Sequence, residues 1–183
     1  MHVTDDTDLR EALARLVGPA GIRLIAAGVR SADEVRRLYA LTADEEESVA
    51  YRAAWTLTHL APAWHAVLHE RYDDLASAAI AAEHAGRRRL LLALLWRQPQ
   101  PEPPRVDLLD FCLDAMADPA QPHGVRMYCM KLAYAMCRTQ RDLLHEFRTL
   151  LELMEPDTLP PSLHAVRRNV LAALERNRPL PRR

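Results

Sequence analysis

The chain has 183 residues, of which 49% are hydrophobic and 27% are charged, and its 24 basic residues nearly balance its 25 acidic ones. These proportions are typical of one globular domain with a core of its own, and the formal net charge of -1 argues against a dedicated nucleic-acid-binding protein. No apolar run reaches the roughly 20 residues of a membrane-spanning helix, and the acidic start does not resemble a signal peptide. We therefore expect a cytoplasmic protein without a membrane anchor.

Sequence signatures of the common enzyme classes are absent. The chain has no GxGxxG or GxxxxGK[ST] phosphate loop, and neither the GxSxG nor the HExxH motif occurs. Its three cysteines, Cys112, Cys129 and Cys137, form no CxxC pair, which favours reduced and buried thiols. We expect no cofactor, no catalytic residue and no metal site.

Apolar residues recur at spacings of three and four along the whole chain, and this pattern predicts an all-α protein. Capping boxes at Ser31–Glu34 and Thr42–Glu45 predict two helix starts, and proline clusters at 99–104, 119–122 and 156–161 predict loops. The predicted helices cover, in chain order, residues 5–17, 20–29, 32–41, 44–60, 64–83, 86–98, 105–117, 123–138, 140–154 and 161–177. The helix at 64–83 is expected to be kinked or split around Tyr72–Asp74.

The sequence also repeats itself with a period of 35 to 37 residues. The segment VDLLDFCL at 106–113 aligns with RDLLHEFR at 141–148, and YDDLASAA at 72–79 is a looser copy. A period of this length, with two alternating helix types, is typical of stacked helical hairpins.

The other helix type of the repeat carries an arginine at its start, and we expect it to be the first helix of each hairpin, followed by a more acidic second helix. Arg52, Arg89 and Arg126 follow one another at steps of 37 residues and each precedes an apolar stretch. A fourth copy, RRNVLAAL, begins at Arg167 after a longer gap that contains the last proline cluster.

This pattern resembles the HEAT and armadillo class of α-solenoids over residues 44–177. The RAAW helix at Tyr51–Trp55 is also similar to a family of short bacterial HEAT-like proteins of unknown function. The resemblance implies one domain at 1–183: a cap of short helices at 1–43, a right-handed α-α superhelix of about three and a half to four hairpins, and a basic tail at 178–183. Some members of that family carry an adenylosuccinate lyase label, but the Ser- and Gly-rich loop with its nearby lysine has no counterpart here, so we do not expect that activity.

Stacked hairpins would align the repeated arginines along one face. One hypothesis pairs them with aspartates of neighbouring helices, at positions 74, 107 and 142, in a ladder of ion pairs and helix-capping hydrogen bonds between repeats. The other has them bind an anionic partner in the groove of the superhelix. On the second hypothesis the candidate binding residues include Arg52, Arg89, Arg126, Arg167 and Arg168.

Arg88 joins this set because it belongs to the only basic triplet, Arg87–Arg89, next to Gly86 at a predicted helix start. Cations there oppose the helix dipole, so an acidic neighbouring helix or a phosphate ligand is expected to offset them. His65 and His69, four residues apart and followed by Glu70, have the spacing of a two-histidine metal site, although no third ligand is evident and exposed polar residues are the alternative.

Three hypotheses about function follow. The first is a non-enzymatic scaffold or adaptor that binds a protein or peptide partner through its concave groove or edge. The second is binding of nucleic acid or another polyanion through the arginine ladder, with tryptophans and tyrosines as base-stacking rather than core residues. The third is an enzyme that uses a metal held by His65 and His69. We expect the first.

Overall fold

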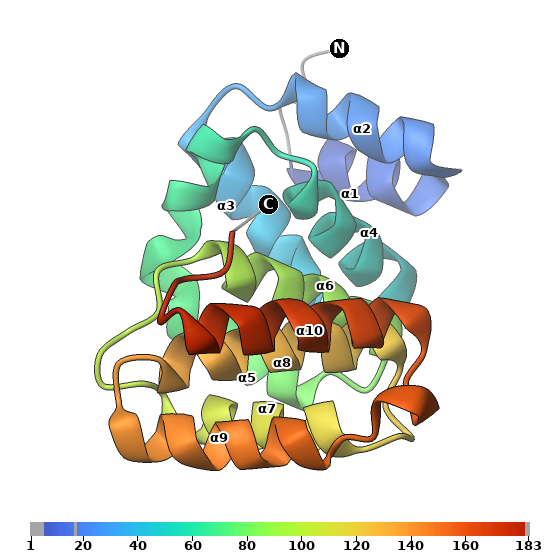
Figure 1. Ribbon diagram of the computed structural model, residues 1–183. Coiled ribbons are helices and arrows are strands. Elements are labelled where there is room, and N and C mark those ends of the chain that lie inside the picture. The colour runs from blue at the N-terminus through green and yellow to red at the C-terminus, as the bar shows by residue number, and fades with distance from the viewer. Residues whose placement is uncertain (1–5, 17, 182–183) are drawn as a thin grey trace. The chain divides into compact units, whose positions relative to one another are not determined.

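A computed structural model describes residues 6–16 and 18–181 of the chain. The predicted positions at 1–5, 17 and 182–183, in the cap, the first helix and the basic tail, lie outside the described residues. The described part contains helices and loops and no strand (Figure 1). Its α-helices are α1 (Asp6–Arg15), α2 (Gly18–Gly28), α3 (Ala32–Ala40), α4 (Glu47–Thr58), α5 (Tyr72–Ala81), α6 (Ala85–Arg97), α7 (Val106–Ala117), α8 (His123–Cys137), α9 (Arg141–Leu153) and α10 (Pro161–Glu175).

Three 3-10 helices interrupt this series: η1 (Leu41–Ala43), η2 (Pro62–Arg71) and η3 (Pro156–Thr158). The split predicted within 64–83 is confirmed, because η2 passes into α5 at Tyr72. None of the described helices has the length and apolar character needed to cross a membrane.

One of the two predicted capping boxes is confirmed and the other is wrong. Ser31 Oγ accepts the amide of Glu34, and the Glu34 carboxylate accepts the amide of Ser31 in return, so α3 begins as predicted. Thr42 is instead part of η1, and its hydroxyl donates to the Tyr39 carbonyl at 2.7 Å. Asp44 takes over at this junction by accepting the amide of Glu46 at 2.9 Å.

The repeated segments coincide with repeated helices. The three aligned copies begin α5, α7 and α9, at Tyr72, Val106 and Arg141. The arginine-led copies lie in α4, α6, α8 and α10. Because α6 packs against α5, α8 against α7 and α10 against α9, each hairpin places the arginine-led helix second, whereas the sequence led us to place it first.

The chain divides into two compact units, Met1–Gln98 and Pro99–Arg183. In the first unit α4 is central, because it contacts α1, α2, α3 and α6. The apolar run Leu90–Trp96 in α6 is buried on all sides, as its sequence predicts. Further core residues of this unit are Leu13, Ile22, Leu38, Leu57 and Leu75.

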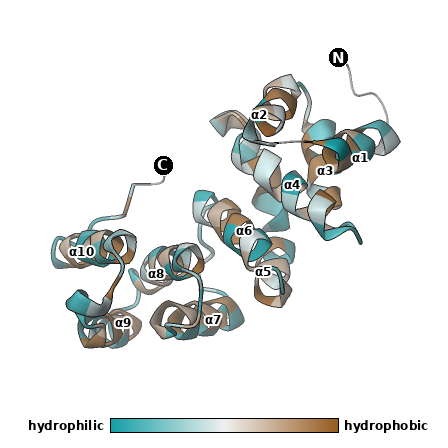
Figure 2. Ribbon diagram, turned by 90° about the vertical axis from the view of Figure 1, so that its right-hand side faces the viewer, coloured by the Kyte–Doolittle hydropathy of each residue, from teal (hydrophilic) through white to brown (hydrophobic). Residues whose placement is uncertain are grey.

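The second unit has two layers. Figure 2 looks along its helices and shows α8 and α10 in one layer and α7 and α9 in the other; α8 contacts the other three helices. The core includes Tyr134 and Phe147, whose ring centroids lie 6.1 Å apart. All three cysteines are free and buried, as predicted, and burial raises the pKa of Cys137 to about 12.

Candidate functional site

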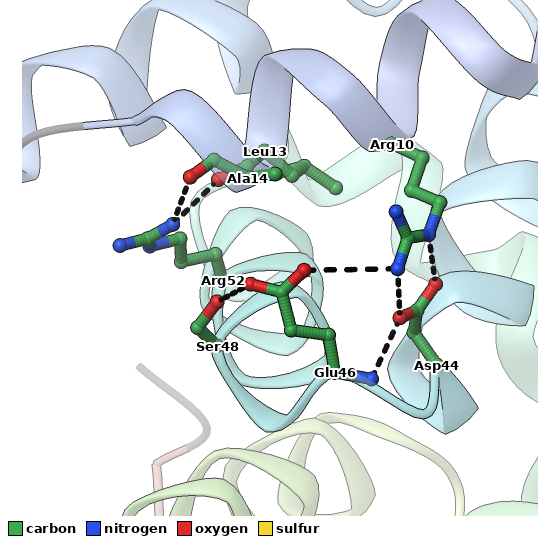
Figure 3. Close-up of polar contacts among 7 residues, drawn as sticks. All are labelled: Arg10, Leu13, Ala14, Asp44, Glu46, Ser48 and Arg52. Carbon is green, nitrogen blue, oxygen red and sulfur yellow. Dashed lines mark hydrogen bonds and ion pairs between the residues drawn. The ribbon is translucent and has the colours of Figure 1, made fainter.

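Three of the four repeated arginines, Arg52, Arg126 and Arg167, bind the ends of other helices. Nη1 of Arg52 in α4 donates to the carbonyls of Leu13 and Ala14, at 2.9 and 2.8 Å, in the last turn of α1 (Figure 3). The last four carbonyls of a helix lack partners within the helix, and a cation is favoured near them by the helix dipole. Arg52 therefore acts as a side-chain cap that joins α1 to α4.

The same contact recurs in the second unit. Arg126, which is buried in α8, donates from Nε to the Met116 carbonyl at 3.1 Å in the last turn of α7. Arg167 of α10 donates from Nε to the Leu151 carbonyl at 2.8 Å in the last turn of α9. The arginine of each of these two hairpins thus joins its second helix to the end of its first.

The predicted ladder is wrong in its ion pairs where the structure tests it, although three of its arginines, Arg52, Arg126 and Arg167, do bind helix-end carbonyls. Asp74 pairs with Arg71 three residues away, at 3.4 Å, and Asp107 pairs with Arg105 at 2.6 Å. Among the described residues neither aspartate pairs with a ladder arginine, and Arg52, Arg126 and Arg167 bind backbone carbonyls instead.

The other predicted binding residues are more exposed to solvent than Arg126. Arg88 and Arg89 are half-buried in the first turns of α6, and Arg168 is exposed on α10. Their neighbour Arg87 pairs with Glu47 of α4 at 3.2 Å and reaches the Thr42 carbonyl, so an acidic helix offsets this part of the triplet. A role of the arginine set in binding a partner stays a prediction.

A second polar network joins α1 to the start of α4. Arg10 binds the Asp44 carboxylate in a bidentate manner, at 2.8 and 3.0 Å, and lies 3.7 Å from Glu46 (Figure 3). Hydrogen bonding to Arg10 holds the pKa of Asp44 below its usual range. With Arg52, this network fastens the first helix at two points, which the sequence did not predict.

The predicted histidine pair is not on one face. A 3-10 helix has three residues per turn, so positions three apart are aligned and positions four apart are not. In η2 this aligns His65 with Leu68, and both are buried, whereas His69 is exposed. The described residues contain no group of three metal-binding side chains.

An acidic groove lies between α7 and α9. It has a volume of about 760 Å³, its apolar floor is formed by Leu113, Ala117 and Leu150, and its carboxylates belong to Asp110, Asp114, Asp118 and Glu146. The three aspartates are spaced four residues apart, so they follow one face of α7. We define these seven residues as the acidic groove. Sequence reasoning missed it, although the spacing of the aspartates was a visible signal.

The charges near the acidic groove make its carboxylates locally unfavourable. Like charges four residues apart destabilise a helix, and Asp114 and Asp118 lie at the end where the dipole is negative. Within the part of the chain that the structure describes, Asp110, Asp114 and Glu146 form no ion pair. The groove therefore presents uncompensated negative charge beside apolar surface.

These features define the class of the protein: an all-α helical repeat protein in which arginine side chains join one helix to the end of another. The family model of the HEAT repeat domain matches residues 9–174. The chain therefore belongs to the HEAT repeat family, which confirms the resemblance seen in the sequence; such repeats commonly mediate protein interactions. No curated protein and no solved structure matches the chain.

Proposed function

We propose that this protein is a non-enzymatic scaffold that binds a basic segment of a partner protein along the acidic groove. The observation that supports this proposal best is that Asp110, Asp114 and Glu146, which form no ion pair within the described residues, line a groove with apolar side chains between α7 and α9. An amphipathic helix with basic residues at every fourth position would place its charges over the aspartates and its apolar face on Leu113 and Leu150.

The same observations favour a protein partner over a polyanion. Three of the arginines that would contact a nucleic acid, Arg52, Arg126 and Arg167, already donate to backbone carbonyls. The groove carries the opposite charge and would repel phosphates. We therefore propose the acidic groove for the protein partner, for which the sequence suggested the concave groove or an edge of the superhelix.

The test measures binding of a labelled helical peptide with arginine at every fourth position and leucine between. Asp110→Asn with Asp114→Asn removes two charges from the groove. We expect this double variant to bind about tenfold more weakly by fluorescence anisotropy, because two exposed ion pairs are worth about 1.4 kcal/mol together.

The matched control is Glu155→Gln with Asp157→Asn, which removes the same charge at exposed positions outside the groove. This control should bind the peptide as the unaltered chain does, and added salt should weaken both. Equal affinities of the groove variant and the unaltered chain would contradict the proposal.

A further inference from the structure

A second cavity of the carboxy-terminal unit has the opposite charge. It has a volume of about 430 Å³ and lies between α8, α10 and the segment 178–181 that follows α10. Three of its lining residues are cationic, Lys131, Arg176 and Arg178, and none is acidic. Much of the remaining wall is apolar and includes Val166, Val170 and Leu180.

The wall formed by residues 178–181 is fixed in place by backbone geometry. Asn177 has a φ of 45°, in the left-handed region, and reverses the chain at the end of α10. Its amide donates to the Leu174 carbonyl at 3.1 Å, and the amide of Arg178 donates to that of Ala173 at 2.9 Å. This pair of bonds is a Schellman motif, which closes the carboxyl end of a helix.

A contact from the neighbouring helix completes this wall. The hydroxyl of Tyr134 in α8 donates to the Arg178 carbonyl at 2.7 Å. Pro179 and Pro181 restrict the backbone that follows. The cavity is therefore a built feature of this unit, with one wall from each helix and one from the returning chain.

Lys131 is the least exposed of the three cations that line this site. It is half-buried, and its Nζ lies 5.3 Å from the centre of the Tyr128 ring. Burial lowers the pKa of Lys131. It is also the only lysine of the chain, among 24 basic residues.

The two arginines that line the cavity are more exposed than Lys131. Arg176 and Arg178 are both exposed, and within the described part of the chain their side chains form no ion pair. Guanidinium groups bind carboxylates and phosphates through paired hydrogen bonds.

We propose that this cavity is a binding site for a small organic anion, with a carboxylate or phosphate head group on an apolar body. Lys131, Arg176 and Arg178 bind the head group, and the apolar wall covers the body. The volume lies within the usual range of small-molecule sites, about 300–1,000 Å³. This inference is independent of the proposed scaffold function, because the acidic groove belongs to α7 and α9 and this cavity to α8 and α10.

The single lysine makes the test direct. The full chain is acetylated with a neutral N-hydroxysuccinimide ester, and mass spectrometry follows Lys131 and the α-amine at the chain start as an internal reference. Octanoate and octyl phosphate are the probes, and 1-octanol and acetate supply the apolar body and the head group alone. We expect at least one probe to slow acetylation of Lys131 about threefold at twice its Kd, while the reference amine is unaffected.

Variants of Arg176 and Arg178 test whether these two side chains bind the head group. Arg176→Gln with Arg178→Gln should raise the Kd of the protecting probe about tenfold, since two charged contacts are lost. Arg36→Gln with Arg141→Gln is the matched control, because it removes the same charge at two exposed positions that do not line the cavity. Circular dichroism checks that both variants remain helical.

Each outcome decides the proposal. Protection by octanoate, by octyl phosphate or by both supports it and identifies the head group. The proposal is overturned if neither probe protects Lys131 better than octanol and acetate do, or if the double variant is protected as well as the unaltered chain.

Discussion

At the scale of single residues, the arginines show how one side chain serves two needs of a helical repeat. A helix end needs donors for its last carbonyls, and a guanidinium supplies a charged donor that can bridge to the next helix. Arg126 is the clearest example because it is buried and its Nε lies 3.1 Å from the Met116 carbonyl. A charge in that position is tolerated because the carbonyl dipoles of α7 offset it.

Replacing Arg126 should therefore cost stability. Arg126→Met keeps an apolar stem of similar length but removes the charged hydrogen bond, and we expect the free energy of unfolding to fall by about 2 kcal/mol. Urea denaturation followed by circular dichroism measures this change. The exposed Arg168→Met should stay within about 0.5 kcal/mol of the unaltered chain; equal losses at both positions would argue against the capping role.

His65 makes stability depend on pH. Burial, and then the positive charge of Arg97 whose Nη1 lies 3.3 Å from Nε2, lowers the pKa of His65 in the folded chain. The unfolded chain then binds the proton more readily, so the contribution is complete above pH of about 6.5 and is lost as the pH falls through and below that value. We expect urea midpoints to decrease between pH 7.5 and pH 5.

Two substitutions isolate the contribution of His65 to this pH dependence. His65→Gln removes the titrating group, so its midpoint should change less with pH than that of the unaltered chain. His69→Gln removes an exposed histidine of the same 3-10 helix and should leave the pH dependence as it was. A pH dependence that is undiminished in His65→Gln would contradict the assignment.

At the scale of helices, a local sequence signal predicted the helix start correctly where the side chain made no competing contact. Ser31 is exposed and free to cap α3, and the capping box forms. Thr42 has the same local pattern, but it is buried in η1 and its hydroxyl binds the preceding turn. The α4 helix therefore begins at Glu47, after a junction organised by Asp44 and Arg10. Tertiary contacts decided between two equal local signals.

The cap of α3 predicts a measurable difference between two serines. Ser31→Ala removes the side-chain acceptor for the Glu34 amide, and we expect a loss of about 1 kcal/mol in the free energy of unfolding. Ser162→Ala lies in the first turn of α10, where no serine cap is formed, so it should change stability little. Thermal or urea unfolding of both variants provides the comparison, and equal effects would contradict the capping role of Ser31.

At the scale of the molecule, charge separates by layer within the carboxy-terminal unit. In α7 there are three acidic residues and no basic one, and in α8 two basic residues and no acidic one. In these hairpins the first helix is thus acidic and the second basic, the reverse of what the sequence pattern suggested. The chain's small net charge conceals this separation, which provides an acidic groove on one layer and a basic cavity on the other.

This distribution predicts weak interaction with nucleic acid. Of the four lysine and arginine side chains of α8 and α10, Arg126 and Arg167 donate to backbone carbonyls and Lys131 lines a small cavity, which leaves the exposed Arg168 for a phosphate backbone. We expect a labelled 20-base-pair duplex to show no binding at micromolar protein and physiological salt in fluorescence anisotropy. Micromolar affinity that falls steeply with added salt would support the nucleic-acid hypothesis instead.

The sequence by itself determined the helical class, the repeat and the helix positions, because apolar periodicity, proline and cap residues act over a few residues at a time. It also identified Arg52, Arg126 and Arg167 as repeated positions, but not their partners. Only the tertiary structure decided which helix-end carbonyls these side chains bind and that four carboxylates line one groove. It also decided that the 3-10 geometry of η2 places His65 and His69 on different faces. The physical reason is that each of these features depends on which residues, distant in sequence, become neighbours when hairpins pack, and local patterns do not encode those distances.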